Sequence, residues 1–218
     1  MRRFWLFLPL GVFSALMFAC GGCGSSSSGG GDSVTAIQIN TVNATGVAIP
    51  STPTILPRGE SVTFSLTQRL SSGGTSIVYS NTVRWETSDP SFVITPSGDY
   101  ITVTPTKDWF DAANTEPTAT ITAHYENLTT TTRVQSVINA NGRWTATAAG
   151  STQKLSLTQH GRTITDAKTG ISGTIDGNKL VINNTLFVVD AHFDTRERAV
   201  GTFSGSGLNG DFACTKDQ

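Results

Sequence analysis

Short runs of alternating apolar and polar residues, separated by Gly, Asn and Pro, fill most of the chain after its first 33 residues. In one run Val62, Phe64 and Leu66 alternate with threonine and serine, and in another Ile101 and Val103 flank a threonine. A two-residue period places the apolar side chains of a strand on one face. This part of the chain contains no convincing amphipathic helix. The pattern therefore predicts an all-β protein.

The strand pattern divides into two segments, residues 33–138 and 139–218. In the first segment, runs with one apolar face between turn residues predict a two-sheet sandwich. In the second, His160-Gly161 and Asp176-Gly177-Asn178 are turn sequences inside predicted hairpins. Successive hairpins favour an up-and-down meander, which closes most economically into a small antiparallel β-barrel.

Three stretches of the first segment occur in the order of a known family pattern. Residues 57–60 lead into a strand, residues 83–90 contain Trp85 followed by Thr-Ser-Asp-Pro, and residues 119–123 read Ala-Thr-Ile-Thr-Ala. The segment resembles bacterial immunoglobulin-like domains of the invasin/intimin type. The resemblance implies an immunoglobulin-like sandwich with a structural or adhesive function. Trp85 would then fill the space between the sheets, and residues 88–90 would form a hydrogen-bonded turn.

Residues 104–117 depart from that family pattern, because the family has a short Gly-containing link at this place. Here the link is longer and carries Trp109 and Phe110. One interpretation is that these aromatic side chains cap the open end of the sandwich. The other is that they form an exposed contact for a protein or glycan partner, since conspicuous apolar loop residues mark interfaces.

The second segment resembles small lipocalin-like barrels of bacterial envelope lipoproteins. The resemblance rests on a Gly-x-Trp opening at Trp144, a Leu-Thr-Gln-x-Gly hairpin at residues 157–161 and repeated Gly-Thr strands. It implies a carrier of a small apolar ligand, a protease inhibitor, or neither. A carrier needs an apolar cavity open at one end. Residues expected to line such a cavity are Trp144, Leu157, Leu180 and Phe203. In so short a barrel we expect the interior to be mostly filled by side chains.

The N-terminus has the layout of an export signal. Arg2 and Arg3 precede an apolar run over residues 4–18, and Ala19 is followed by Cys20. The run is shorter than the roughly 20 residues of a membrane-spanning helix. Residues 1–19 resemble a bacterial lipoprotein signal, which implies lipidation at Cys20 and anchoring in a membrane. Plain secretion is the alternative.

Residues 20–32 form a Gly/Ser-rich stretch, which predicts a flexible tether between anchor and folded body. Gly21 stands where aspartate retains such lipoproteins in the inner membrane, so the resemblance implies the outer membrane of the cell envelope. Cys23 and Cys214 would remain free to form a disulfide in an oxidising compartment. Neither their spacing nor their position argues for that bond.

Charge and motifs exclude several functions. The net charge is −1, and no basic patch is present of the kind that nucleic acid requires. Asp190, His192 and Asp194 alternate on one strand face and would either line the barrel interior or form its solvent side. No catalytic, metal or cofactor motif is recognisable. The sequence thus predicts a non-enzymatic envelope lipoprotein that is a structural or adhesive module; the alternative is a carrier or inhibitor acting through the barrel.

Overall fold

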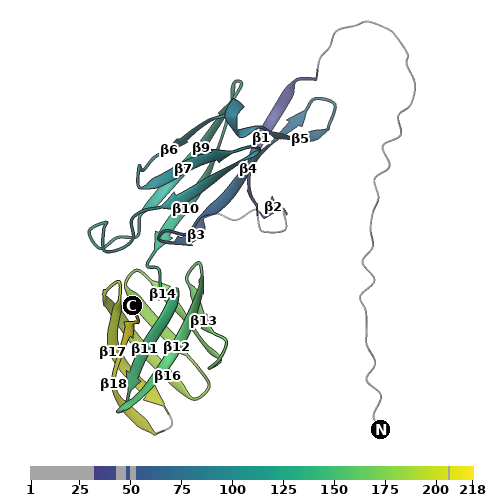
Figure 1. Cartoon of the computed structure of the whole chain (residues 1–218). Helices are drawn as coiled ribbons and strands as arrows, with labels where there is room; N and C mark the ends of the chain where they lie inside the picture. Colours follow the sequence, from purple (N-terminus) through teal and green to yellow (C-terminus); the bar gives the residue numbers. More distant parts are fainter. Residues whose placement is uncertain (1–31, 43–47, 50–52, 206) are drawn as a thin grey trace, which may run out of the picture. The chain divides into compact units, whose positions relative to one another are not determined.

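The computed structural model describes residues 32–42, 48–49, 53–205 and 207–218 (Figure 1). Asp32–Gln218 forms one compact unit. Within its described residues, the regular elements are β-strands and one 3₁₀ turn, η1 (Ser80–Thr82). The expected signal, the expected lipidation site Cys20 and most of the expected tether lie outside the described residues. The predicted all-β class, a sandwich followed by a closed barrel, is confirmed.

Two sheets form the sandwich. The first sheet has the order β2-β1-β4-β8-β7, with β5 also paired to β4, and the second has the order β3-β10-β9-β6. The strands of the first sheet are β1 (Val34–Val42), β2 (Ala48–Ile49), β4 (Val62–Leu70), β5 (Thr75–Val78), β7 (Phe92–Ser97) and β8 (Tyr100–Pro105). Those of the second are β3 (Thr54–Pro57), β6 (Arg84–Thr87), β9 (Thr118–Tyr125) and β10 (Leu128–Val137). Among the described strand pairs of the sandwich, β3 with β10 is the one that runs parallel. This strand order is the immunoglobulin arrangement.

The predicted alternation accounts for the sandwich core. Phe64, Leu66, Ile101 and Ile121 are fully buried between the two sheets. Trp85 packs against both hydrophobic clusters of the sandwich, as expected for a residue that fills the space between sheets. Burial of such apolar surface is the main favourable contribution to folding.

A hydrogen-bonded corner follows Trp85, where the sequence predicts a turn. The Asp89 carboxylate accepts a hydrogen bond from the Ser91 backbone N–H at 2.8 Å, and Thr87 Oγ1 donates to the Asp89 carbonyl at 2.9 Å. Ser88 Oγ accepts from the Thr120 backbone N–H at 2.9 Å, which ties the corner to β9. The short polar side chains thus satisfy backbone groups where the ladder ends.

Eight consecutive antiparallel strands close the barrel, with β18 pairing back to β11. They are β11 (Gly142–Ala148), β12 (Ser151–His160), β13 (Thr163–Asp166), β14 (Ile171–Asp176), β15 (Lys179–Asn183), β16 (Phe187–Thr195), β17 (Arg198–Gly205) and β18 (Leu208–Lys216). Both predicted hairpins are present, with turns at Gly161 and Gly177 that have φ of 59° and 60°. Glycine adopts this left-handed conformation without steric cost.

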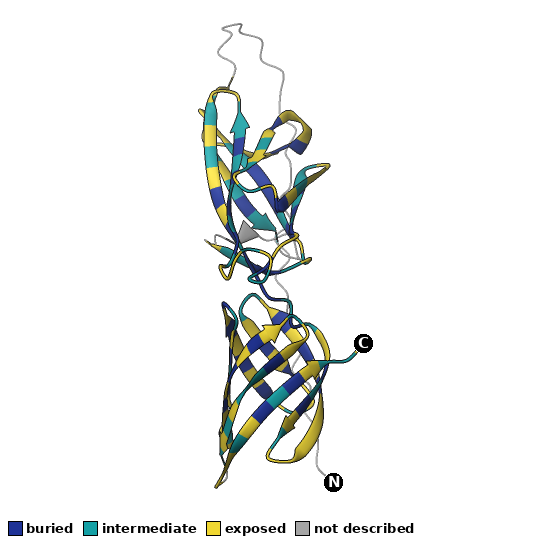
Figure 2. Cartoon of the chain, turned by 90° about the vertical axis from the view of Figure 1, so that its left-hand side faces the viewer, coloured by how far each residue is buried: buried dark blue, intermediate teal, exposed yellow. Residues whose placement is uncertain are grey.

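Buried and exposed residues alternate along the barrel strands (Figure 2). On β16 Val189, Ala191 and Phe193 are buried in the barrel core. Asp190, His192 and Asp194 are exposed on the outside. Of the two interpretations that the sequence left open, the solvent-facing one is therefore correct.

The loop between β8 and β9 belongs to the sandwich and contacts the barrel. Trp109 and Phe110 are half-buried and pack against the hydrophobic core of the barrel. An added Cβ on Gly177, in the β14–β15 turn, would lie 2.8 Å from Trp109 Cζ3. The aromatic pair thus seals the barrel end next to the sandwich, which neither interpretation of the sequence foresaw.

Candidate binding site

The barrel end next to the sandwich is filled. Trp144 is fully buried, and its Nε1 donates a hydrogen bond to the Ala140 carbonyl at 2.8 Å. Its ring meets that of Phe193 edge-on, with centroids 6.0 Å apart. Gln159, 2% exposed, donates to the carbonyls of Ile138 and Gly161 and accepts from the Ala140 N–H. The buried polar groups of Trp144 and Gln159 are therefore satisfied, and these side chains fill the barrel interior at this end.

The opposite end of the barrel contains an apolar cavity of about 260 Å³. Phe187 and Phe203 lie on one side of it, with ring centroids 5.6 Å apart. The other lining residues are Ala146, Ala148, Ala149, Ser151, Gln153, Leu155, Ile171, Ile182, Val189, Leu208 and Phe212. The volume falls just below the roughly 300–1,000 Å³ typical of small-molecule sites.

Chemically, this cavity suits an apolar group. No charged side chain is among its described lining residues, and Ser151 and Gln153 are the polar ones. Leu208 at the rim is 57% exposed. Binding an apolar group here would remove this surface from water. The two polar side chains, both at the start of β12, would orient a ligand that carries one polar end.

Of the four residues expected to line a carrier cavity, one does so. Phe203 lines the cavity, whereas Trp144, Leu157 and Leu180 belong to the buried core. The interior is thus filled in one half and hollow in the other. Phe187 and Phe212 were not predicted as lining residues. The alternation of their strands indicated that they point inward, but not at which level along the barrel they lie.

The structure brings together the three residues proposed from sequence as ligand or partner contacts. Trp144 is part of the barrel core, and Trp109 and Phe110 pack against that same core from the sandwich loop. Phe110 also lies under the Arg196 guanidinium, 5.8 Å from its ring centroid. All three side chains thus make contacts within the chain, and a partner contact through them stays a prediction.

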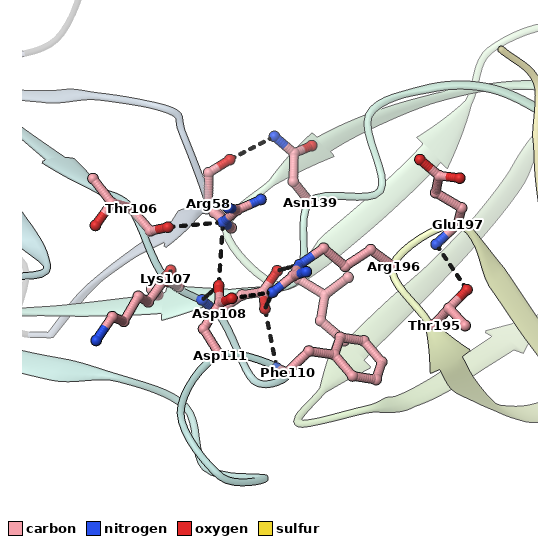
Figure 3. A network of polar contacts seen from close by, with 12 residues as sticks. Arg58, Thr106, Lys107, Asp108, Phe110, Asp111, Asn139, Thr195, Arg196 and Glu197 are labelled. Carbon is pink, nitrogen blue, oxygen red and sulfur yellow. Dashed lines mark hydrogen bonds and ion pairs between the residues drawn. The ribbon is translucent and has the colours of Figure 1, made fainter.

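Ion pairs surround these aromatic contacts (Figure 3). Arg196, in the β16–β17 turn, bonds Asp108 at 2.8 and 3.0 Å and Asp111 at 2.5 Å. The hydrogen bond from Arg196 to Asp108 is the main reason that the pKa of Arg196 is raised. Arg58 lies 3.4 Å from Asp111 and donates to the Thr106 carbonyl. A second group of ion pairs and hydrogen bonds is centred on Glu116.

Glu116 accepts hydrogen bonds from three directions. Arg162 Nη1 donates to it at 2.7 Å, the Gly177 N–H at 2.8 Å and Gln135 Nε2 at 2.7 Å. Arg162 also pairs with Asp176 at 2.6 Å. The bonds to Glu116 raise the pKa of Arg162 despite partial burial. The junction between sandwich and barrel is therefore both apolar and ionic.

The described part of the chain also bears on metal binding, on membrane crossing and on the cysteines. No group of three His, Cys, Asp or Glu side chains is placed there as metal ligands would be. Within the same residues, no helix has the length and hydropathy needed to cross a membrane. Cys214 is a free thiol in the barrel core, 4% exposed. Its suggested partner Cys23 lies outside the described residues.

Comparison with known proteins gives little guidance. No family model and no curated protein matches the chain. Among solved structures, domains 4–9 of the surface layer protein SbsC align with a TM-score of 0.36 at 10% identity, covering 86% of this chain and 27% of that one. Domains 5–6 of the S-layer protein SbsC align with the same TM-score and identity, covering 85% of each chain. Likeness at this level is no basis for assigning a function.

Proposed function

We propose that this chain is a lipid-anchored, non-enzymatic binding protein of the cell envelope, whose barrel takes a small apolar ligand at its open end. The observation that supports this best is the apolar cavity of about 260 Å³ at one end of a barrel whose other end is filled. Anchoring through Cys20, in the outer membrane, rests on the resemblance of residues 1–20 to a lipoprotein signal.

The sandwich supplies the second part of the proposal. Its loop seals one end of the barrel through Trp109 and Phe110, and the Arg196–Asp108 and Arg162–Glu116 pairs attach the two domains to each other. A spacer linked in this way presents the barrel without free rotation between domains. The same rigid connection favours the second candidate, an adhesive or structural module that contacts a protein or glycan partner.

Native mass spectrometry of residues 33–218, exported without the lipid anchor, tests the carrier function. We expect a reproducible additional mass of a small apolar compound. The variant Ala148→Phe places bulk at the cavity wall and should abolish that mass. Thr147→Phe, whose side chain points outward on the same strand, is the matched control and should retain it. A wild-type chain that stays ligand-free when offered decanoate would overturn the carrier proposal and leave the adhesive one.

A further inference from the structure

The barrel wall is incompletely paired along β12. Residues 151–157 pair with β11 on one side, from Ser151 opposite Ala148 to Leu157 opposite Gly142. On the other side, β13 pairs only with Thr158, Gln159 and His160. Among the described residues, the first seven positions of β12 therefore have a neighbouring strand on one side only.

The direction of the unpaired backbone groups follows from ladder geometry. In an antiparallel pair, successive residues point their N–H and C=O groups alternately to the two sides. The tight turn after Ala148 makes Ser151 and its odd-numbered neighbours bond to β11. Thr152, Lys154 and Ser156 therefore point their backbone groups away from β11, toward the side where β13 is missing. Such a free edge is a template for another strand.

Two hollows meet at this edge. The apolar cavity reaches β12 through Ser151, Gln153 and Leu155, with Ile171 of β14 across from them. A second hollow of about 470 Å³ lies on the outer side, and Leu155 lines both. The second hollow is lined by Arg143, Lys154, Leu155, Ser156, Lys168 and Asp217. Space for a further strand thus exists between β12 and the β13–β14 turn that carries Lys168.

The two faces of this space differ in chemistry. The inner face is apolar, whereas the outer face has three cations, Arg143, Lys154 and Lys168, and one carboxylate, Asp217, which pairs with Lys154 at 3.1 Å. Side chains of an extended peptide point alternately to opposite faces. A peptide that alternates apolar and acidic residues would therefore match both faces at once.

We propose that the free edge of β12 binds an extended segment of a partner protein by strand addition, with the segment's apolar side chains in the cavity and its acidic side chains beside Lys154 and Lys168. Main-chain hydrogen bonds to residues 152–156 supply affinity, and the alternating faces supply specificity. A second copy of this chain is a poorer occupant, because antiparallel self-pairing centred on this edge sets Lys154 beside Lys154. The proposal goes beyond small-ligand binding, since it depends on the backbone edge.

A synthetic peptide of four Val-Glu repeats, with blocked ends, tests the proposal on residues 33–218. We expect it to bind in calorimetry, and the amides of Thr152, Lys154 and Ser156 to gain protection from hydrogen exchange. A Val-Lys peptide of the same length should bind about tenfold more weakly or not at all. Failure of Val-Glu to bind, or protection confined to other strands, would overturn strand addition.

The variant Ser156→Pro distinguishes binding through the backbone edge of β12 from binding in the cavity. Proline removes only the N–H that faces the free side, a position that an edge strand tolerates. We expect about tenfold weaker peptide binding, because one main-chain hydrogen bond is lost, while Ser156→Ala should bind like the wild type. If Ser156→Pro does not fold, Lys168→Glu tests the same site through charge and should weaken Val-Glu binding. Wild-type peptide affinity in Ser156→Pro or Lys168→Glu would refute the proposal, whereas mass spectrometry of the wild type with decanoate and of Ala148→Phe decides the carrier function.

Discussion

Arg196 holds Asp108 by two parallel hydrogen bonds, from Nε to Oδ2 at 2.8 Å and from Nη2 to Oδ1 at 3.0 Å, across 88 residues of sequence. The Asp108 side chain is 1% exposed, and that of Arg196 is 37% exposed. A forked guanidinium on a carboxylate fixes orientation as well as distance. One turn of the barrel is thereby held against one loop of the sandwich.

The variant Arg196→Met should lower the free energy of unfolding by about 3 kcal/mol, because it leaves the buried Asp108 carboxylate without its cation. Urea unfolding followed by tryptophan fluorescence measures this. Arg84→Met is the control, since Arg84 is 70% exposed and pairs with Glu86 on the surface. Removing an exposed pair should cost less than about 1 kcal/mol. Equal losses in both variants would contradict the importance of the Arg196–Asp108 pair.

Asp111 should make stability fall in acid. Burial acts to raise its pKa, but the Asp108 N–H and the cations Arg196 and Arg58 together hold it below the ordinary 3.8. A carboxylate with a lowered pKa contributes stability above the pKa of the unfolded chain and loses it as the pH falls through the folded value. Unfolding between about pH 5 and pH 2 should therefore be less pH-dependent in Asp111→Asn than in the wild type. Carbon-detected NMR titration of Asp111 in the wild type gives the folded pKa directly.

Gly201 and Gly210 on the neighbouring strands β17 and β18 should respond differently to alanine. A Cβ on Gly201 would lie 2.2 Å from the Asp190 carbonyl oxygen and 2.4 Å from Ala191 Cα, so backbone must move. Gly201→Ala should destabilise the protein by about 3 kcal/mol. A Cβ on Gly210 would meet nothing within 4 Å, and Gly210→Ala should change stability by less than about 0.5 kcal/mol. Thermal unfolding of both variants decides; similar melting temperatures would show that the β16–β17 contact is looser than described.

The Cys214 thiol should be unreactive in the folded protein. Burial in the barrel core raises its pKa from 9.0 to about 11, so it is neutral at pH 8. Iodoacetamide should label it slowly without denaturant and rapidly in urea, as measured by intact mass. Its contribution to stability is present below the unfolded pKa of 9.0 and is lost as the pH rises toward about 11. Rapid labelling of the native protein would contradict this placement and make pairing with Cys23 easier to accept.

Local sequence patterns predicted the elements well. The hairpins at Gly161 and Gly177, the buried face of β4 and the corner after Trp85 depend on neighbouring residues, so a period of two and turn residues suffice to place them. The pairing of Asp108 with Arg196 has no such signal. It depends on the fold bringing a sandwich loop to a barrel turn, which nothing local to either residue specifies.

For the binding site, the sequence predicted which side chains point into the barrel, but not at which level along the barrel each one lies. Alternation indicated that Trp144 and Phe203 both point into the barrel, yet Trp144 fills the end next to the sandwich while Phe203 lines the hollow end. The difference depends on total side-chain volume at each level of the barrel, which requires the strand register. The free edge of β12 likewise arises from the shortness of β13, whose end at Asp166 the sequence left unspecified.

The parallel pairing of β3 with β10 has a mechanical consequence. β3 ends beside the last residue of β10, because Pro57 pairs with Val137, and β10 continues from there into the barrel. Tension that reaches Thr54 from the N-terminal side and Ile138 from the barrel side would pull these two strands in opposite directions along their length. Their hydrogen bonds would then be loaded in shear and share the force, instead of opening one after another. A domain whose end strands are joined in this way would resist stretching more strongly than one whose end strands separate bond by bond.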